Sequence, residues 1–259
     1  MPFLLHGEIR YFQFELFRQG LIHAVFTRQG GVSPEPWAAL NLGSMVGDDS
    51  ERVRENQRLA LASLFRDLES VYDVWQVHGV AVAIANAPRP PKVPHLQADV
   101  VLTDKPGLTL LMRFADCVPI LLHDPVRKVV GIAHAGWMGT VRGTARFAVE
   151  AMQKHYGSMP ADILAAIGPS IGPDHYEVGA DVALQVKQSF RSDASDLLSL
   201  NTGSMKFDLW AANRLLLEQA GVSQVEVAGL CTACNTGDWY SHRAEKGRTG
   251  RFGAIIALV

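Results

Sequence analysis

Two apolar runs with a short polar segment between them dominate the middle of the chain. Residues 118–123 read VPILLH, residues 129–134 read VVGIAH, and DPVRK separates them at 124–128. The Asp-Pro start of the separating segment favours a turn, and both flanking runs have the length of strands. The pattern therefore predicts a β-hairpin with a five-residue loop.

The register of this hairpin has a chemical consequence. If His123 and Val129 face each other, Val118 stands opposite His134. Cys117 then lies beside that pair. Opposed Cβ atoms are roughly 4.5–5.5 Å apart, close enough for a thiolate and an imidazole to share one metal ion. The hairpin thus predicts a metal site, although a slip of one residue would turn one ligand away.

Other segments carry the periodicities of strands and helices. Short apolar runs predict strands, which are expected at residues 71–78, 98–103, 108–112, 163–167, 225–230 and 253–259, with one or two more between 12 and 25. Apolar residues at helical spacing predict helices, which are expected to begin near 50 and near 140 and to cover 177–190 and 209–220. Ser50 or Asp49 can cap the first helix.

The irregular alternation of strands and helices predicts the fold class. Hairpins are mixed with helical segments, and the Pro-rich stretch at 87–97 is expected to be a surface loop and not a domain linker. We therefore expect an α+β fold, in which residues 1–259 form a single domain with mixed β-sheets flanked by helices.

Composition and charge narrow the function classes. The chain is 48% hydrophobic and 19% charged, as expected of a globular enzyme. Its formal charge of −2 gives no reason to expect nucleic-acid or membrane binding. Three cysteines and an N-terminus without a secretory signal predict a cytoplasmic protein with unpaired thiols. No obligate protein partner is evident.

The predicted site at the hairpin needs a third ligand. Catalytic zinc keeps three protein ligands and one open position. The local sequence does not select that ligand among His78, His123, Asp116 and other groups, although His123 is disfavoured. It stands at the turn, roughly 17 Å of strand away from Cys117. The alternative to a metal site is a buried thiol beside a core imidazole.

Eight segments in order along the chain carry a resemblance to a known family. They are FTRQGGVS (26–33), NLG (41–43), VGDD (46–49), QVHG (76–79), ADCVPIL (115–121), HAGWMGT (134–140), IGPSIGP (167–173) and SHR (241–243). The sequence resembles the YfiH-type family, also known as the laccase-domain or multicopper polyphenol oxidase family. The resemblance covers nearly the whole chain and implies a single-domain mixed fold with zinc bound by His78, Cys117 and His134. It also implies purine nucleoside phosphorolysis, including that of methylthioadenosine, and adenosine deamination.

The sequence departs from the family pattern in one place. Many members carry two cysteines before the tyrosine at 176, where this chain has Asp174 and His175. This change affects either the rim of the pocket or only the surface. The pair Cys231 and Cys234 is a variable feature of the family, and we expect it to be reduced, since two thiols alone do not complete a structural zinc site.

Several residues near the predicted metal are candidates for catalysis and binding. Asp116, next to the cysteine ligand, is expected to act as a general acid/base or, alternatively, to orient a histidine. The turn from Gly136 to Thr140 leads into a helix with Arg142 in its first turn, and free N–H groups there favour phosphate. Weaker candidates for contacts with sugar hydroxyls or phosphate are Arg28, Asn41, Glu177 and Arg243.

A copper oxidase is the first rival interpretation. His78, Cys117 and His134 also satisfy the ligand set of a blue-copper centre, with Met112 or Met138 as an axial ligand, so copper is possible in place of zinc. A laccase also needs a histidine-rich oxygen-reducing cluster. This chain has nine histidines and no His-x-His pair. The residue types therefore fit zinc better.

Two further alternatives come from other motifs. The segments His6-Gly7-Glu8 and Cys231-Thr-Ala-Cys234 imitate the two halves of the zinc nucleobase-deaminase signature. However, Leu230 replaces its proline, and residue 6 is expected in a strand. A non-enzymatic zinc-binding module is the other alternative, although structural zinc normally has four protein ligands. The partners that the family resemblance implies are a purine nucleoside and phosphate.

Overall fold

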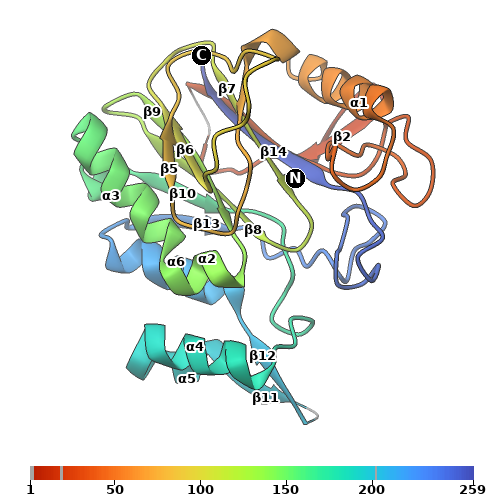
Figure 1. The fold of residues 1–259 in the computed structure, drawn as a ribbon. Coiled ribbons are helices and arrows are strands. Elements are labelled where there is room, and N and C mark those ends of the chain that lie inside the picture. The colour runs from red at the N-terminus through yellow and green to blue at the C-terminus, as the bar shows by residue number, and fades with distance from the viewer. Residues whose placement is uncertain (1–2, 18–19, 202) are drawn as a thin grey trace.

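A computed structural model describes residues 3–17, 20–201 and 203–259 of the protein. Within these ranges the strands form two six-stranded sheets and a two-stranded ribbon (Figure 1). The first sheet has the order β1 (Phe3–His6), β2 (Ile9–Phe12), β3 (Leu21–Phe26), β14 (Phe252–Leu258), β7 (Thr109–Phe114) and β4 (Val71–Asp73). The second has the order β13 (Gln224–Val227), β10 (Leu164–Ile167), β8 (Val118–Asp124), β9 (Val129–Ala135), β6 (Val100–Thr103) and β5 (Val82–Ile84). The ribbon pairs β11 (Leu198–Asn201) with β12 (Ser204–Phe207).

Both sheets are mixed. The pairs β4–β7, β5–β6 and β10–β13 are parallel, and the neighbouring strands in the sheets otherwise pair antiparallel. This arrangement confirms the predicted α+β class and its mixed sheets. Every helix in the described ranges is too short or too polar to span a bilayer.

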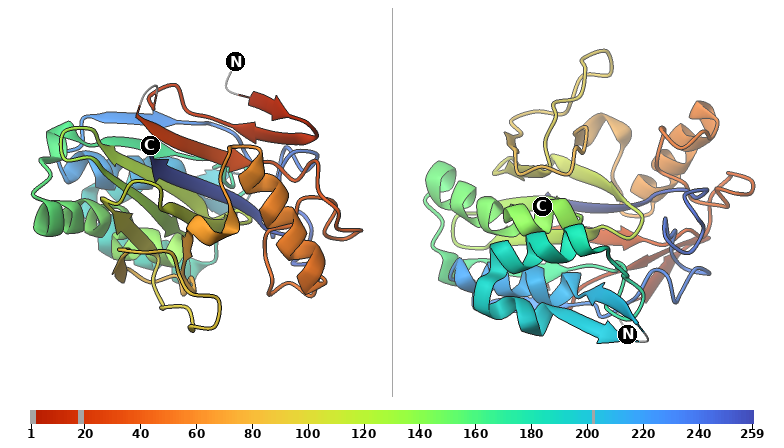
Figure 2. Two further views of the ribbon diagram at one scale, coloured as in Figure 1. Left: turned by 90° about the horizontal axis from the view of Figure 1, so that it is seen from above. Right: turned by 60° about the horizontal axis from the view of Figure 1, so that its bottom comes forward.

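Helices pack against the outer faces of the two large sheets and against the two-stranded ribbon. They are α1 (Ser50–Ala62), α2 (Trp137–Arg142), α3 (Thr144–Tyr156), α4 (Ala180–Phe190), α5 (Ala194–Leu197) and α6 (Leu209–Gln219), with short 3₁₀ turns at Leu68–Ser70, Pro160–Asp162 and Arg191–Asp193. Ala60 and Leu61 of α1 pack against the first sheet, whereas Val149 of α3 and Leu217 of α6 pack against the second. Seen from above, the strands lie between α1 and α3 (Figure 2).

The inner faces of the two sheets make a shared core. Met112 and Phe114 of the first sheet pack in one cluster with Leu121 and Ile132 of the second. Every residue of β8 and β9 is therefore buried, because β-strands covered on both faces have no solvent side. This double coverage explains why the two runs are continuously apolar and do not alternate.

The hairpin of β8 and β9 is confirmed, but its predicted register is wrong by one residue. Asp124 still belongs to the ladder and pairs with Val129, so the loop has four residues and not five. The Asp124 carboxylate accepts two backbone N–H groups of that loop, which keeps the residue at the strand end. As a result Pro119, and not Val118, stands opposite His134.

Two other predicted elements end or break early. The strand expected over 71–78 stops at Asp73. Beyond it the Trp75 amide donates to the Leu96 carbonyl, and the backbone N–H groups of residues 77–79 donate to the carboxylate of Asp99. The helix expected from 140 begins at Trp137 and is interrupted at Gly143, whose φ of 87° is left-handed. The remaining predicted strands and helices are present with shifted ends, and the N-cap of α1 is Asp49.

Candidate metal centre

His78, Cys117 and His134 converge at one point of the fold. One ligand atom of each lies within 4.8 Å of the others, and Cys117 Sγ is 3.9 Å from His78 Nε2. The centroids of the two imidazole rings are 4.9 Å apart. The three side chains come from the loop after β4, the residue before β8 and the end of β9. They are suited to hold one metal ion, and their role as its ligands stays a prediction.

The backbone before β8 explains why the register error does not separate these residues. Cys117 precedes the first residue of the ladder, so its direction is not set by strand pairing. Asp116 before it has a left-handed φ of 81°, and His78 has a φ of 59°. Left-handed non-glycine residues are uncommon and cluster at functional sites. The backbone at Asp116 and at His78 is therefore held in a conformation that these residue types rarely adopt, as is common at functional sites.

A residue that the sequence analysis missed supports two of the three side chains. Asp99 is fully buried, and its Oδ1 lies 2.8 Å from His134 Nδ1 and accepts the His78 amide at 3.0 Å. Its Oδ2 accepts the Gly79 amide at 2.7 Å. Burial raises the pKa of Asp99, but the hydrogen bonds from His134 and from the backbone outweigh it and lower the pKa. The ionised carboxylate thus fixes one histidine ring and the loop of the other.

Neighbouring histidines and close packing favour metal binding by Cys117. Burial raises the pKa of Cys117, but the neighbouring His134 and His78 outweigh this effect and lower it. The thiolate that they favour is the form of cysteine that binds metals. A Cβ atom at Gly136 would lie 2.9 Å from Cys117 Sγ and 3.1 Å from His78 Cδ2. Glycine at 136 therefore leaves the space that the three side chains need.

A cavity of about 1490 Å³ opens beside the three side chains and is lined by all of them. Trp137 and Tyr176 contribute aromatic surface, and Asp116, Arg243 and His242 contribute polar groups. Typical sites for small molecules have volumes of about 300–1,000 Å³. The cavity therefore has room for a nucleoside together with an anion.

One wall of the cavity carries an ion-pair network. Asp73 binds Arg89 at 2.7 Å and Arg113 at 2.8 Å, and all three residues line the cavity. Burial raises the pKa of Asp73, but the two arginines outweigh it and lower the pKa to about 2. The two guanidinium groups are thus already paired with a carboxylate on this wall.

Asp116 makes different contacts from those expected of a histidine partner. Its Oδ1 accepts the Thr232 hydroxyl at 2.7 Å, and its Oδ2 accepts the Arg243 backbone amide at 2.6 Å. At His134 the carboxylate partner is Asp99, so the role of Asp116, as a general acid/base or as a residue that orients a histidine, stays a prediction. Asp116 instead joins the loops that carry residues 232 and 243 to the cysteine.

The predicted anion-binding residues separate into two groups. Gly136 and Arg243 line the cavity, whereas Arg142 is exposed and donates to the carbonyl oxygen of His78 at 3.4 Å. Arg243 donates to the carbonyl of Glu177 at 2.9 Å and lies over the Tyr176 ring. These partners are uncharged, so the positive charge of Arg243 remains available at the cavity.

Four other candidates do not line this cavity, and their contact with substrate stays a prediction. Thr140 is fully buried and accepts the side-chain amide of Asn213 at 2.9 Å. Asn41 is also buried; its Nδ2 donates to the Gly43 carbonyl, and its Oδ1 accepts the backbone amides of Gly43 and Arg251. Arg28 pairs with Glu245 at 3.0 Å beside a second, separate cavity. Glu177 is exposed and contributes a carbonyl oxygen, not its carboxylate, to the contacts of Arg243.

The structure also places the residues of the rival deaminase and copper interpretations. His6 lies in β1 of the first sheet, whereas Cys231 and Cys234 follow β13 of the second, so the imitated deaminase motif is not assembled. The thiols of Cys231 and Cys234 are unpaired, in agreement with the prediction. Of the two proposed axial methionines, Met138 lines the cavity and Met112 lies in the core between the sheets.

Known proteins resemble this chain over most of its length. The purine nucleoside phosphorylase of Deinococcus radiodurans is 41% identical over 236 residues, which are 91% of this chain and 88% of the relative. Purine nucleoside phosphorylase YlmD of Geobacillus stearothermophilus is 37% identical over 248 residues, which are 92% of this chain and 90% of that protein. The crystal structure of the Bacillus licheniformis hypothetical protein YfiH has a TM-score of 0.92 at 34% identity and covers 100% of this chain and 99% of its own.

The family comparison agrees with the motifs in the sequence. The family described as "Multi-copper polyphenol oxidoreductase laccase" matches residues 22–259. Taken with the relatives and the structural neighbour, this match shows that the chain belongs to that family.

Proposed function

We propose that the protein is a zinc-dependent purine nucleoside phosphorylase of the cytoplasm that also deaminates adenosine. Adenosine, inosine and methylthioadenosine are its proposed substrates. The observation that carries the proposal is the convergence of His78, Cys117 and His134 on the wall of a cavity of about 1490 Å³. The relatives named purine nucleoside phosphorylase support the substrate class.

The donor set fits zinc. One thiolate and two imidazoles are common zinc ligands, and three protein ligands beside an open cavity match the catalytic type of site. Asp99 supplies the carboxylate partner that metal-bound histidines usually have. When bound there, zinc supplies a Lewis acid that polarises an oxygen of the reactants.

Residues of the chain itself would bind and orient the two substrates. We propose that Arg243 binds phosphate, because it lines the cavity and its guanidinium group contacts the uncharged Glu177 carbonyl and Tyr176 ring. Arg142 and the backbone at Gly136 lie close enough to His78 to assist. Trp137 and Tyr176 offer aromatic surface on which a purine can stack.

Asp116 has two proposed contributions. Its carboxylate holds the backbone of Arg243 and so positions the phosphate-binding side chain. It also lines the cavity directly beside the cysteine, where a carboxylate can accept or donate a proton as a general acid/base. Replacement by Asn retains the shape of the side chain and removes the proton transfer, so this variant separates the two contributions.

A copper-dependent polyphenol oxidase is the second candidate, because the family description itself names such an activity. The same three ligands also suit a blue-copper ion. Among the described residues, however, the possible metal-binding groups are this one and a second that contains a single histidine. A histidine-rich oxygen-reducing cluster does not form from them.

The decisive experiment is product analysis of the zinc-loaded protein. Adenosine, inosine and methylthioadenosine are each incubated with and without phosphate, and free base, sugar phosphate and ammonia are measured. We expect base release that requires phosphate and ammonia release from adenosine that does not. Cys117→Ala should abolish both activities and remove the zinc ion of the cavity, whereas the exposed-surface variant Lys154→Ala should retain both activities and that ion.

Three outcomes would overturn the proposal. Full zinc content and full activity in Cys117→Ala would exclude the proposed ligand set. Oxygen consumption with a phenolic substrate and an intense blue colour after copper loading, without nucleoside turnover, would favour the oxidase. Zinc binding without turnover of any of the three nucleosides would favour a non-enzymatic module.

A further inference from the structure

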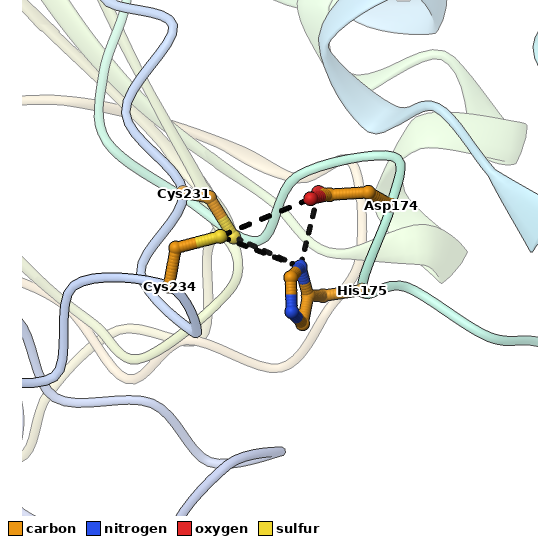
Figure 3. Close-up of side chains that lie close together, drawn as sticks. All are labelled: Asp174, His175, Cys231 and Cys234. Carbon is orange, nitrogen blue, oxygen red and sulfur yellow. Dashed lines mark hydrogen bonds and ion pairs between the residues drawn. The ribbon is translucent and has the colours of Figure 1, made fainter.

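A second cluster of metal-ligating side chains lies outside the cavity. Asp174 and His175 from the loop after β10 point toward Cys231 and Cys234 from the loop after β13 (Figure 3). One ligand atom of each lies within 4.8 Å of the other three. Cys231 is buried, and the other three are exposed.

Four distances in this cluster are close to those of a tetrahedral site. Zinc has bonds of about 2.3 Å to sulfur and about 2.0–2.2 Å to nitrogen or oxygen, which gives donor–donor edges of about 3.3–3.8 Å. His175 Nδ1 lies 3.4 Å from Cys234 Sγ and 3.9 Å from Cys231 Sγ. Asp174 lies 3.9 Å from Cys234 Sγ through Oδ2 and 3.0 Å from His175 Nδ1 through Oδ1. Small side-chain adjustments would place all four donors around one ion.

Both loops hold their ligands through backbone contacts. The Gly172 amide donates to Cys231 Sγ at 3.2 Å, an interaction that stabilises a thiolate. A Cβ atom at Gly172 would lie 2.9 Å from Asp174 Oδ1 and 3.2 Å from that sulfur, so the turn needs glycine to bring the two loops together. The carbonyl of Cys231 accepts both the backbone and the side-chain amide of Asn235, which closes the turn between the cysteines.

We propose that Asp174, His175, Cys231 and Cys234 bind a second metal ion, a divalent thiophilic cation for which zinc is the best match. Two thiolates spaced Cys-x-x-Cys with one imidazole and one carboxylate give a soft tetrahedral donor set, which selects zinc over magnesium or calcium. Four protein ligands leave no open position, so this ion is structural. The assignment is independent of the proposed activity of the cavity.

The ion would join two loops that build the cavity wall. Ile171 and Tyr176 flank the Asp174–His175 pair and line the cavity. Thr232 between the two cysteines donates to Asp116 Oδ1, and the Ile171 amide donates to the Asp116 carbonyl at 3.0 Å. The second ion therefore fixes the segments that hold Asp116 beside the cysteine of the first cluster.

Metal stoichiometry of the full-length reduced protein tests the assignment. The protein is stripped with a chelator, reloaded with Zn²⁺ and freed of excess metal, and zinc per chain is measured by mass spectrometry. We expect two ions in the unmodified protein, one in Cys117→Ala and one in Cys231→Ser/Cys234→Ser. Zinc should raise the melting temperature of the stripped unmodified protein, and this increase should be smaller in the double variant. The two variants serve as controls for each other.

Cobalt absorption spectra of Cys117→Ala test the second site even if the double variant does not fold. Cys117→Ala loaded with Co²⁺ should keep a sulfur-to-cobalt absorption band, with roughly two thirds of the intensity of the unmodified protein because two of three thiolates remain. A thiol-reactive dye should label its Cys234 more slowly after metal loading. One ion in the unmodified protein together with no ion and no sulfur-to-cobalt band in Cys117→Ala would overturn the proposal.

Discussion

The two clusters of metal-ligating residues use similar side chains in opposite settings. His78, Cys117 and His134 stand on the wall of a large cavity; the first lies in the loop after β4, and the other two lie at the ends of the buried strands β8 and β9. Asp174, His175, Cys231 and Cys234 lie on two turns at the surface and surround their common point with four donors. Three donors beside a cavity leave a position for a reactant, whereas four donors close the coordination sphere.

The groups that hold the ligands of each cluster in place differ with the position of the cluster in the fold. The cavity cluster depends on a buried carboxylate, Asp99, which can bond a ring and several amides at once because the sheet brings them together. The surface cluster depends on backbone groups, such as the Gly172 amide on Cys231 Sγ. Changes in support should therefore affect one cluster and leave the other intact.

The largest expected effect comes from Gly136→Ala. The added Cβ atom would lie 2.9 Å from Cys117 Sγ, so the thiol would have to turn out of the site. We expect loss of the cavity ion and a fall in nucleoside turnover of about 10²-fold or more, because misplacement by about 1 Å has effects of that size. Zinc content and steady-state kinetics measure both.

A matched glycine provides the control for this variant. A Cβ atom at Gly237 would have no neighbour within 4 Å, so Gly237→Ala should keep its zinc and its turnover. The surface ion should remain in both proteins. Retention of two ions and full turnover in Gly136→Ala would contradict the tight packing of the cavity cluster.

The cavity cluster could be predicted in large part from the sequence, and the reasons are local. Cys117 and His134 flank one hairpin, which an apolar pattern reveals, and His78 lies in a motif of the resembled family. The register was wrong because the Asp124 side chain bonds the turn and keeps its residue in the strand. The site survives because Cys117 lies before the ladder.

The supporting residue and the second cluster could not be predicted in this way. Asp99 reads as one polar residue at the head of an apolar strand, and only the pairing of β6 with β9 brings it to His134. Asp174 and Cys231 are separated by 56 intervening residues in the sequence. They meet because β10 and β13 are parallel neighbours whose following loops lie at the same edge of the sheet. Spacing along a chain carries no such information.

The next prediction, Asp99→Asn, has a smaller expected effect. The amide keeps the shape of the side chain but loses the charge and one acceptor, so His134 and the loop of His78 are held less firmly. Loss of such partners lowers metal affinity about 10–100-fold. Competition with a chromogenic chelator should show this loss for the cavity ion alone. Asp104→Asn, which removes a carboxylate paired with Lys105, should change neither affinity, and an equal loss at both ions would contradict the separation of the clusters.

The smallest expected effect concerns a side-chain hydrogen bond that joins the two regions. Thr232→Val removes the hydroxyl that donates to Asp116 Oδ1 at 2.7 Å but retains the shape of the side chain. We expect the free energy of unfolding of the zinc-loaded protein to fall by about 1–3 kcal/mol, since the buried carboxylate oxygen loses its donor. Urea unfolding measures the change, and Thr232→Ser should restore most of the lost stability.

Both ions should stay bound in Thr232→Val, because neither coordination sphere contains this hydroxyl. Loss of either ion would show that the two clusters depend on each other through Asp116. That result would contradict the view that a reactive site and a structural site are supported separately.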